Sequence, residues 1–141
     1  METSEIRKLV LQMLERAKRR SLEHRSQADN AQRAYDALLP NVATAWRQVA
    51  NALRVEGHAF TVHTPSSALR FASDRSADDF IELSLDTSRR PAALWLQVRL
   101  ARGHRVIERE LILAEGEAVA GVTEEQLIAA LLDELEPFVQ R

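Results

Sequence analysis

Apolar and polar positions alternate most regularly along Ala92–Ala114, and this alternation predicts a β-hairpin. Leucine or valine stands at every second position of Leu94–Leu100, with Trp95 and polar residues between them. A second alternating run follows Gly103, a residue that tolerates the positive φ of a tight turn. One face of this hairpin is apolar and the other carries mixed charge, which is typical of a sheet packed on one side only.

The turn also predicts which residues of the two strands face each other. Folding the chain about it places Val98 opposite Ile107 and brings Arg99 close to Glu108 on the outer face. Arg109 interrupts the apolar face, and either a position at the edge of the sheet or a β-bulge would account for it.

Three shorter segments with the same alternation precede the hairpin, at residues 58–64, 69–71 and 81–85. With the hairpin they predict an antiparallel meander of about five strands. Helices are expected on one face of this sheet, so the fold class is α+β. We expect a single domain, 1–141, divided into a helical N-terminal arm at 1–57, a sheet at 58–115 and a C-terminal helix at 122–138.

The segment Thr3–Leu38 predicts one long helix, because its apolar and small residues recur every three or four positions. Pro40 suits the first turn of a second helix that ends at Gly57, and a nearly continuous helix bent at Leu39–Pro40 is the alternative. A helix of about 35 residues is roughly 50 Å long. A compact domain of this size has a radius of gyration of only about 14 Å. The helix therefore overhangs the body, folds back near Ser21 or pairs with another chain.

The C-terminal helix has the clearest local signal. Thr123 and Gln126 have the spacing of a capping box, and Pro137 is expected to end the helix. The small and acidic segment 114–121 before it is expected to be a loop.

Composition narrows the class of protein. The chain has 141 residues, a formal net charge of −2 and no cysteine. Disulfides, thiolate catalysis and cysteine-based metal sites are therefore excluded within it. It has neither the pattern of a secretory signal nor an apolar run of about 20 residues, so we expect a cytoplasmic protein that does not enter a membrane.

No motif of an enzyme or of a cofactor site is present, and we expect neither catalysis nor a cofactor. The four histidines lack the spacing of a metal pair, so no metal site is predicted either. Four carboxylates line the outer face of the sheet; cross-strand pairing with Arg70 and Arg99 is favoured there over acid–base catalysis. The four are Glu82, Asp86, Glu108 and Glu110.

The leading hypothesis is a non-enzymatic interaction domain, of an adaptor or chaperone-like kind, that forms a homodimer through its long N-terminal helix. Another protein is a second candidate partner. A long helix, an antiparallel sheet and a C-terminal helix resemble the layout of small dimeric chaperone and adaptor proteins. Trp95 lies on the polar face of the sheet, where it would either anchor a partner or be covered by a loop or the long helix. The candidate interface comprises Ile6, Val10, Met13, Ala17, Ala28, Ala31, Tyr35 and Trp95.

Two alternatives stay open. An apolar ligand could occupy a cavity between sheet and helices, lined by Phe60, Phe71, Leu83, Leu96 and Leu131, although these residues are also the best core candidates. Nucleic-acid binding would use an anion contact at Lys18, Arg19 and Arg20, but an acidic net charge and 5% aromatic residues argue against it.

Overall fold

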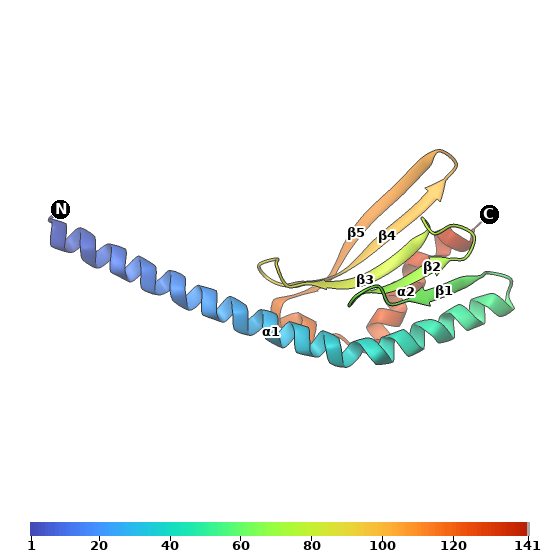
Figure 1. The fold of residues 1–141 in the computed structure, drawn as a ribbon, viewed down its shortest axis with the longest axis horizontal. Helices are drawn as coiled ribbons and strands as arrows, with labels where there is room; N and C mark the ends of the chain where they lie inside the picture. Colours follow the sequence, from blue (N-terminus) through green and yellow to red (C-terminus); the bar gives the residue numbers. More distant parts are fainter. Residues whose placement is uncertain (141) are drawn as a thin grey trace.

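The computed structural model describes residues 1–140 and has the expected α+β architecture. A long helix, α1 (Thr3–Val55), precedes a five-stranded antiparallel sheet with the strand order β1-β2-β3-β4-β5 (Figure 1). A short 3-10 helix, η1 (Gly116–Gly121), and the helix α2 (Glu124–Val139) follow the sheet. The strands are β1 (Phe60–His63), β2 (Leu69–Ser73), β3 (Phe80–Asp86), β4 (Ala93–Arg102) and β5 (Arg105–Glu115).

The segment before the sheet is one continuous helix, as the alternative interpretation expected, because α1 continues through Pro40 and is not divided there into two helices. The proline is exposed, and α1 bends in this region so that its concave side faces the sheet (Figure 1). A proline that lacks its N–H is tolerated at such a bend, since the helix there opens toward solvent. The helix ends in a Schellman motif, in which Gly57 has a φ of 89° and His58 donates its backbone N–H to the Leu53 carbonyl over 2.9 Å.

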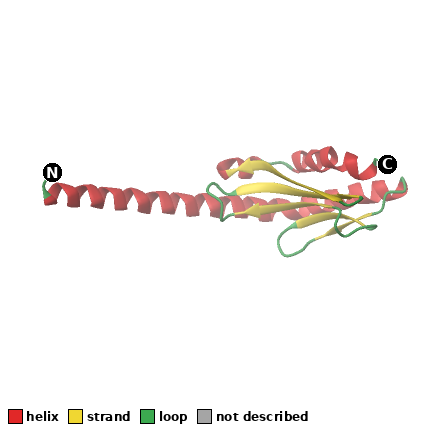
Figure 2. Ribbon diagram, turned by 90° about the horizontal axis from the view of Figure 1, so that it is seen from above, coloured by secondary structure: helices red, strands yellow, loops and turns green. Residues whose placement is uncertain are grey.

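One face of the sheet packs against the C-terminal half of α1 and against α2, so all the helices contribute to a single core (Figure 2). Trp46 of α1 is fully buried and lies edge-on to Phe71 of β2, with ring centroids 6.2 Å apart. Its indole N–H donates to the Leu127 carbonyl of α2 over 3.3 Å. Trp46 therefore ties both helices to the sheet.

The central hairpin forms as expected, but the predicted register is only partly right. Arg99 does lie opposite Glu108, whereas Val98 lies opposite Arg109 instead of Ile107. Gly103 and the residue after it form the turn, because the strands are paired up to Arg102 and Arg105. This turn centre is one residue further along than expected, which shifts every facing pair by two positions and leaves the inner and outer faces unchanged.

Arg109 occupies the inner face of β5, which is one of the two edge strands of the sheet. Its guanidinium reaches past the core to Glu134 of α2, with an N–O distance of 3.1 Å. An edge position therefore accounts for Arg109 on the apolar face. A β-bulge does not, because the irregularity in this hairpin lies elsewhere, between Leu94 and Trp95.

The segment before α2 is not a plain loop, because Gly116–Gly121 forms η1 and buries Val119 in the core. The capping box is confirmed: the Thr123 hydroxyl accepts from the Gln126 N–H at 3.2 Å, and the Gln126 side chain accepts from the Thr123 N–H at 3.0 Å. Pro137 does not end α2, which continues to Val139.

Candidate interaction surface

The N-terminal part of α1 projects far beyond the body of the molecule (Figures 1 and 2). Every residue up to Arg20 is exposed, and Ser21 is the first whose side chain is partly shielded. We call residues 3–20 of α1 the arm. It carries a concentration of exposed apolar side chains that the body does not cover, namely Ile6, Leu9, Val10, Leu11, Met13 and Leu14.

Most of these side chains continue the face by which α1 packs on the sheet. Five turns of an α-helix take about 18 residues, so positions 18 apart point in the same direction. Met13 of the arm is 18 positions before Ala31, and Ala17 is 18 positions before Tyr35. Since Ala31 and Tyr35 are 2% exposed in the core, Met13 and Ala17 face the side on which the sheet lies.

The arm therefore presents a continuous apolar face with no covering element among the described residues. We call this surface the arm face. Leu9 and Leu14 flank its centre, while Leu11 lies on the opposite side of the helix. The large side chains of the arm face are between 45% and 53% exposed, and they are Ile6, Leu9, Val10, Met13 and Leu14. A stripe of this size on an isolated helix is typical of an interface.

Seven of the eight candidate interface residues belong to α1 and divide into three groups in the structure, and the eighth, Trp95, lies in β4. Ile6, Val10, Met13 and Ala17 lie together on the arm face, as the spacing predicted. Ala28 is half-buried at the start of the body. Ala31 and Tyr35 have to be removed from the interface, because the chain buries them in its own core. Leu9 and Leu14 were not part of the predicted stripe, but they are exposed on the same arm.

Tyr35 joins α1 to the turn between β1 and β2. Its hydroxyl donates to the backbone carbonyl of Ser67 over 2.5 Å. Burial raises the pKa of this phenol well above its ordinary value, and the negative charges of Asp36 and Glu82 raise it further. The neutral hydroxyl is therefore a structural donor at all moderate pH values.

The cationic cluster does not form one anion site. Lys18, Arg19 and Arg20 are consecutive in a helix, so their side chains are about 100° apart and point over a range of about 200°. All three are exposed. Diverging cations of this kind provide no common position for a phosphate group.

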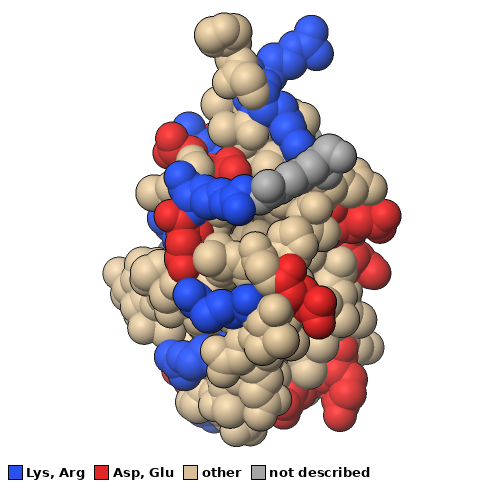
Figure 3. Space-filling model, turned by 90° about the vertical axis from the view of Figure 1, so that its right-hand side faces the viewer, with Lys and Arg blue, Asp and Glu red and all other residues tan. Residues whose placement is uncertain are grey.

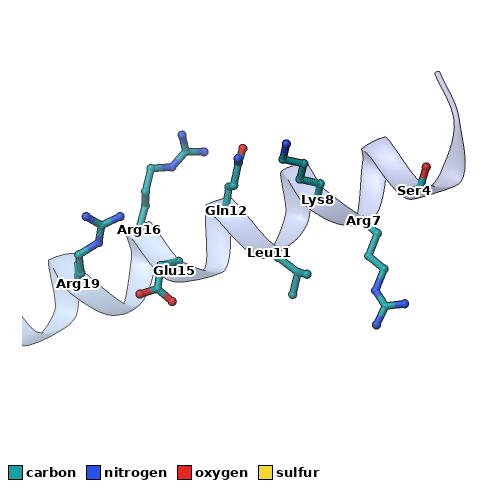
Figure 4. Close-up of a pocket in the computed structure, with 8 residues that line it drawn as sticks. All are labelled: Ser4, Arg7, Lys8, Leu11, Gln12, Glu15, Arg16 and Arg19. Atoms are coloured by element: carbon teal, nitrogen blue, oxygen red, sulfur yellow. The ribbon is translucent and has the colours of Figure 1, made fainter.

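A hollow lies on the outer side of the arm (Figure 4). Its lining comes from one helix, with Arg7 and Leu11 on one side and Lys8, Gln12 and Arg16 on the other. These side chains point away from one another, so the hollow is open surface between them. Ligand cavities, in contrast, are concave sites that enclose most of the ligand.

Trp95 is half-buried on the outer face of the sheet, and the guanidinium of Arg89 lies 5.5 Å from the centre of its ring. Its cross-strand partner is Ile112, which is 42% exposed. Arg89 belongs to the connection between β3 and β4. Coverage by a loop is therefore the better interpretation of Trp95, and this residue lies apart from the arm face.

The outer carboxylates are paired with arginines. Arg70 contacts Glu82 at 2.9 Å and Arg99 contacts Glu108 at 3.5 Å, while Arg89 contacts both remaining carboxylates. Hydrogen bonds from the Ser88 hydroxyl and backbone N–H lower the pKa of Asp86, and Arg89 lowers it further. A general acid needs a raised pKa, so these contacts favour charge pairing over catalysis.

The residues suggested for an apolar cavity are part of the packed core. All five are at most 5% exposed, and the rings of Phe60 and Phe71 stack with centroids 5.0 Å apart. Their mutual contacts occupy the space between sheet and helices, which favours the core interpretation.

Within residues 1–140, no group of three or more His, Asp or Glu side chains could hold a metal ion. No helix in the same range is both long and apolar enough to cross a membrane.

The end of the molecule opposite the arm carries interspersed cationic and anionic side chains (Figure 3). The cationic side chains on this face have carboxylates among them, whereas nucleic-acid binders usually show a cationic patch.

Comparisons of this chain with family models, with curated proteins and with solved structures found no match.

Proposed function

We propose that this protein is a non-enzymatic interaction module that self-associates as a homodimer through the arm face. The observation that supports the proposal is the exposed apolar face of residues 3–20, which continues the core-facing side of α1 beyond the body. A helix that is isolated from its neighbours gains no packing energy, so an apolar face of this length favours a partner helix.

A second copy is the simplest partner, because it carries a matching apolar face of the same length. Five large side chains per copy are about half exposed. Burying each remaining half contributes about 1 kcal/mol, or roughly 10 kcal/mol for a two-fold pair. Association costs about 4–15 kcal/mol, so the net affinity is modest and the dimer should dissociate on dilution.

Sedimentation of the full chain over a wide concentration range tests this proposal. We expect the mass to rise from 15.9 kDa toward twice that value. The double variant Leu9→Asp/Leu14→Asp should remain a monomer, because it places charges at both borders of the arm face.

Leu11→Asp/Leu22→Asp is the matched control. It introduces the same two carboxylates at exposed leucines on the other side of α1, and it should associate like the original chain. Circular dichroism should show the same folded body in all three proteins. A monomeric mass for the original chain at every concentration, or equal loss of association in both variants, would contradict the proposal.

A further inference from the structure

We infer that the two arms pair antiparallel about a two-fold axis between Leu11 and Gln12. This inference rests on the homodimer proposed above and specifies its geometry. In this register Ile6 lies level with Ala17 of the second copy, and Val10 lies level with Met13 of the second copy. All four residues occupy the centre of the arm face, so each level of the pair joins apolar side chains.

The length of the arm matches this register. An axis between positions 11 and 12 places Thr3 level with Arg20 of the second copy. The overlap then covers residues 3–20 of both chains, which is the whole arm. Ser21, where shielding by the body begins, lies just beyond the end of the partner helix. Both apolar faces are therefore covered from end to end while the second arm stops where the first body starts.

Charge along one border of the arm face favours the same orientation. Glu2 and Glu5 lie at the start of this border, and Arg16 and Arg20 lie at its other end. In an antiparallel two-fold pair, equivalent borders lie beside each other. Glu5 then lies between Arg16 and Arg20 of the second copy, and Glu2 lies beside Arg20. A parallel, in-register pair would instead place this border beside the other border of the second copy, so that Glu5 would lie near Arg7 but both Arg16 and Arg20 would repel Lys18.

The other border of the arm face carries Arg7 and Lys18. In this register Arg7 lies two positions away from the point level with Lys18 of the second copy, so these two cations repel each other. Both are exposed, long side chains that can direct their charges into solvent. The variant Lys18→Glu should consequently strengthen the antiparallel dimer, since it replaces two repulsions by two attractions.

Disulfide trapping tests the orientation directly, because the natural chain has no cysteine. The single variants Ile6→Cys and Ala17→Cys are oxidised separately and as an equal mixture. In the antiparallel register, equivalent positions are 11 residues apart along the helix axis, or about 16 Å. A disulfide requires Cα atoms within about 7 Å. We therefore expect a cross-linked dimer in the mixture and none in either variant alone.

Each other outcome is decisive. Cross-linking of each variant alone would indicate parallel arms and overturn the inference while leaving the homodimer intact. A dimeric mass without cross-linking in any sample would also overturn it. A monomeric mass for the original chain would contradict the proposed function itself. Leu11→Cys, on the outer side of the arm, gives the background of disulfides formed by random collision.

Charge exchange provides an independent readout. Glu5→Arg and Arg16→Glu should each raise the dissociation constant of the dimer several-fold. An equal mixture of the two variants should recover the original affinity, because both border pairs of the mixed dimer then join opposite charges. Failure of the mixture to recover would count against the antiparallel register.

Discussion

The single tyrosine of the chain allows the attachment of α1 to the sheet to be tested by pH. Tyr35 is 2% exposed, and burial raises its pKa well above the ordinary value of 10.0. Its ionised form is thus disfavoured in the folded state. Because the folded-state pKa is raised, the associated stability is complete below pH 10 and is lost as the pH rises toward the folded-state pKa.

The size of the loss follows from linkage. Above pH 10 the unfolded phenol ionises while the folded one stays neutral, which lowers the free energy of unfolding by about 1.4 kcal/mol per pH unit. By pH 12 the loss amounts to roughly 3 kcal/mol. Two lysines, Lys8 and Lys18, also occur in the chain, but both lie on the exposed arm and remain in the comparison variant.

Urea unfolding of the original chain and of Tyr35→Phe, measured between pH 8 and pH 12, would check this prediction. At neutral pH the variant should be less stable by about 1 kcal/mol, because it lacks the hydrogen bond to the Ser67 carbonyl. Above pH 10 the difference should shrink and then reverse. The near-ultraviolet absorbance of the phenolate should appear only as the original chain unfolds.

Two results would refute this reasoning about Tyr35. The first is an equal alkaline loss of stability in the original chain and in the variant. The second is a phenolate signal that rises near pH 10 while circular dichroism still reports the folded state. Either would mean that solvent reaches the hydroxyl and that α1 is held less tightly over the turn between β1 and β2.

Three further substitutions test the local structure, with urea unfolding as the measurement in each case. Thr123→Ala should lower the free energy of unfolding by about 1 kcal/mol through loss of the α2 cap, whereas Thr123→Ser should retain most of it. Gly57→Ala should destabilise because its φ is 89°, whereas Gly121→Ala, which meets no atom within 4 Å and has no positive φ, should be neutral. Trp46→Ala should cost about 3–5 kcal/mol because it empties the centre of the core.

Periodicity predicted the sheet well because β1, β2, β3 and β4 each contribute buried side chains to the core, whereas β5 contributes only partly buried ones. The Arg99–Glu108 pair followed from that alternation and is present. The pairing of Val98 with Arg109 did not follow from it. Alternation specifies the face on which a side chain lies, but it does not distinguish between two facing residues that are two positions apart. Only the turn fixes that choice, and Gly103 can occupy more than one position within a turn.

The long helix shows where local propensity failed. A proline inside a helix costs about 3 kcal/mol, which argued for a boundary at Pro40. Packing of Tyr35 on one side and of Val42 and Trp46 on the other outweighs that cost, and propensity has no information about such contacts. The same reason explains why Ala31 and Tyr35 were assigned to an interface: the stripe identifies an apolar face without indicating what covers each part of it.

The continuity of α1 makes the direction of the arm face depend on residue count. Each residue inserted or deleted between Arg20 and Gln27 would rotate the whole arm about its axis by about 100°. One such change would turn the apolar side chains away from the side of the sheet, although no residue of the arm or the body had been altered. A change of seven residues, close to two full turns, would restore the direction to within about 20°. The helical segment that joins the arm to the body therefore sets the direction of the arm face through its length, and the number of its residues matters more than their identity.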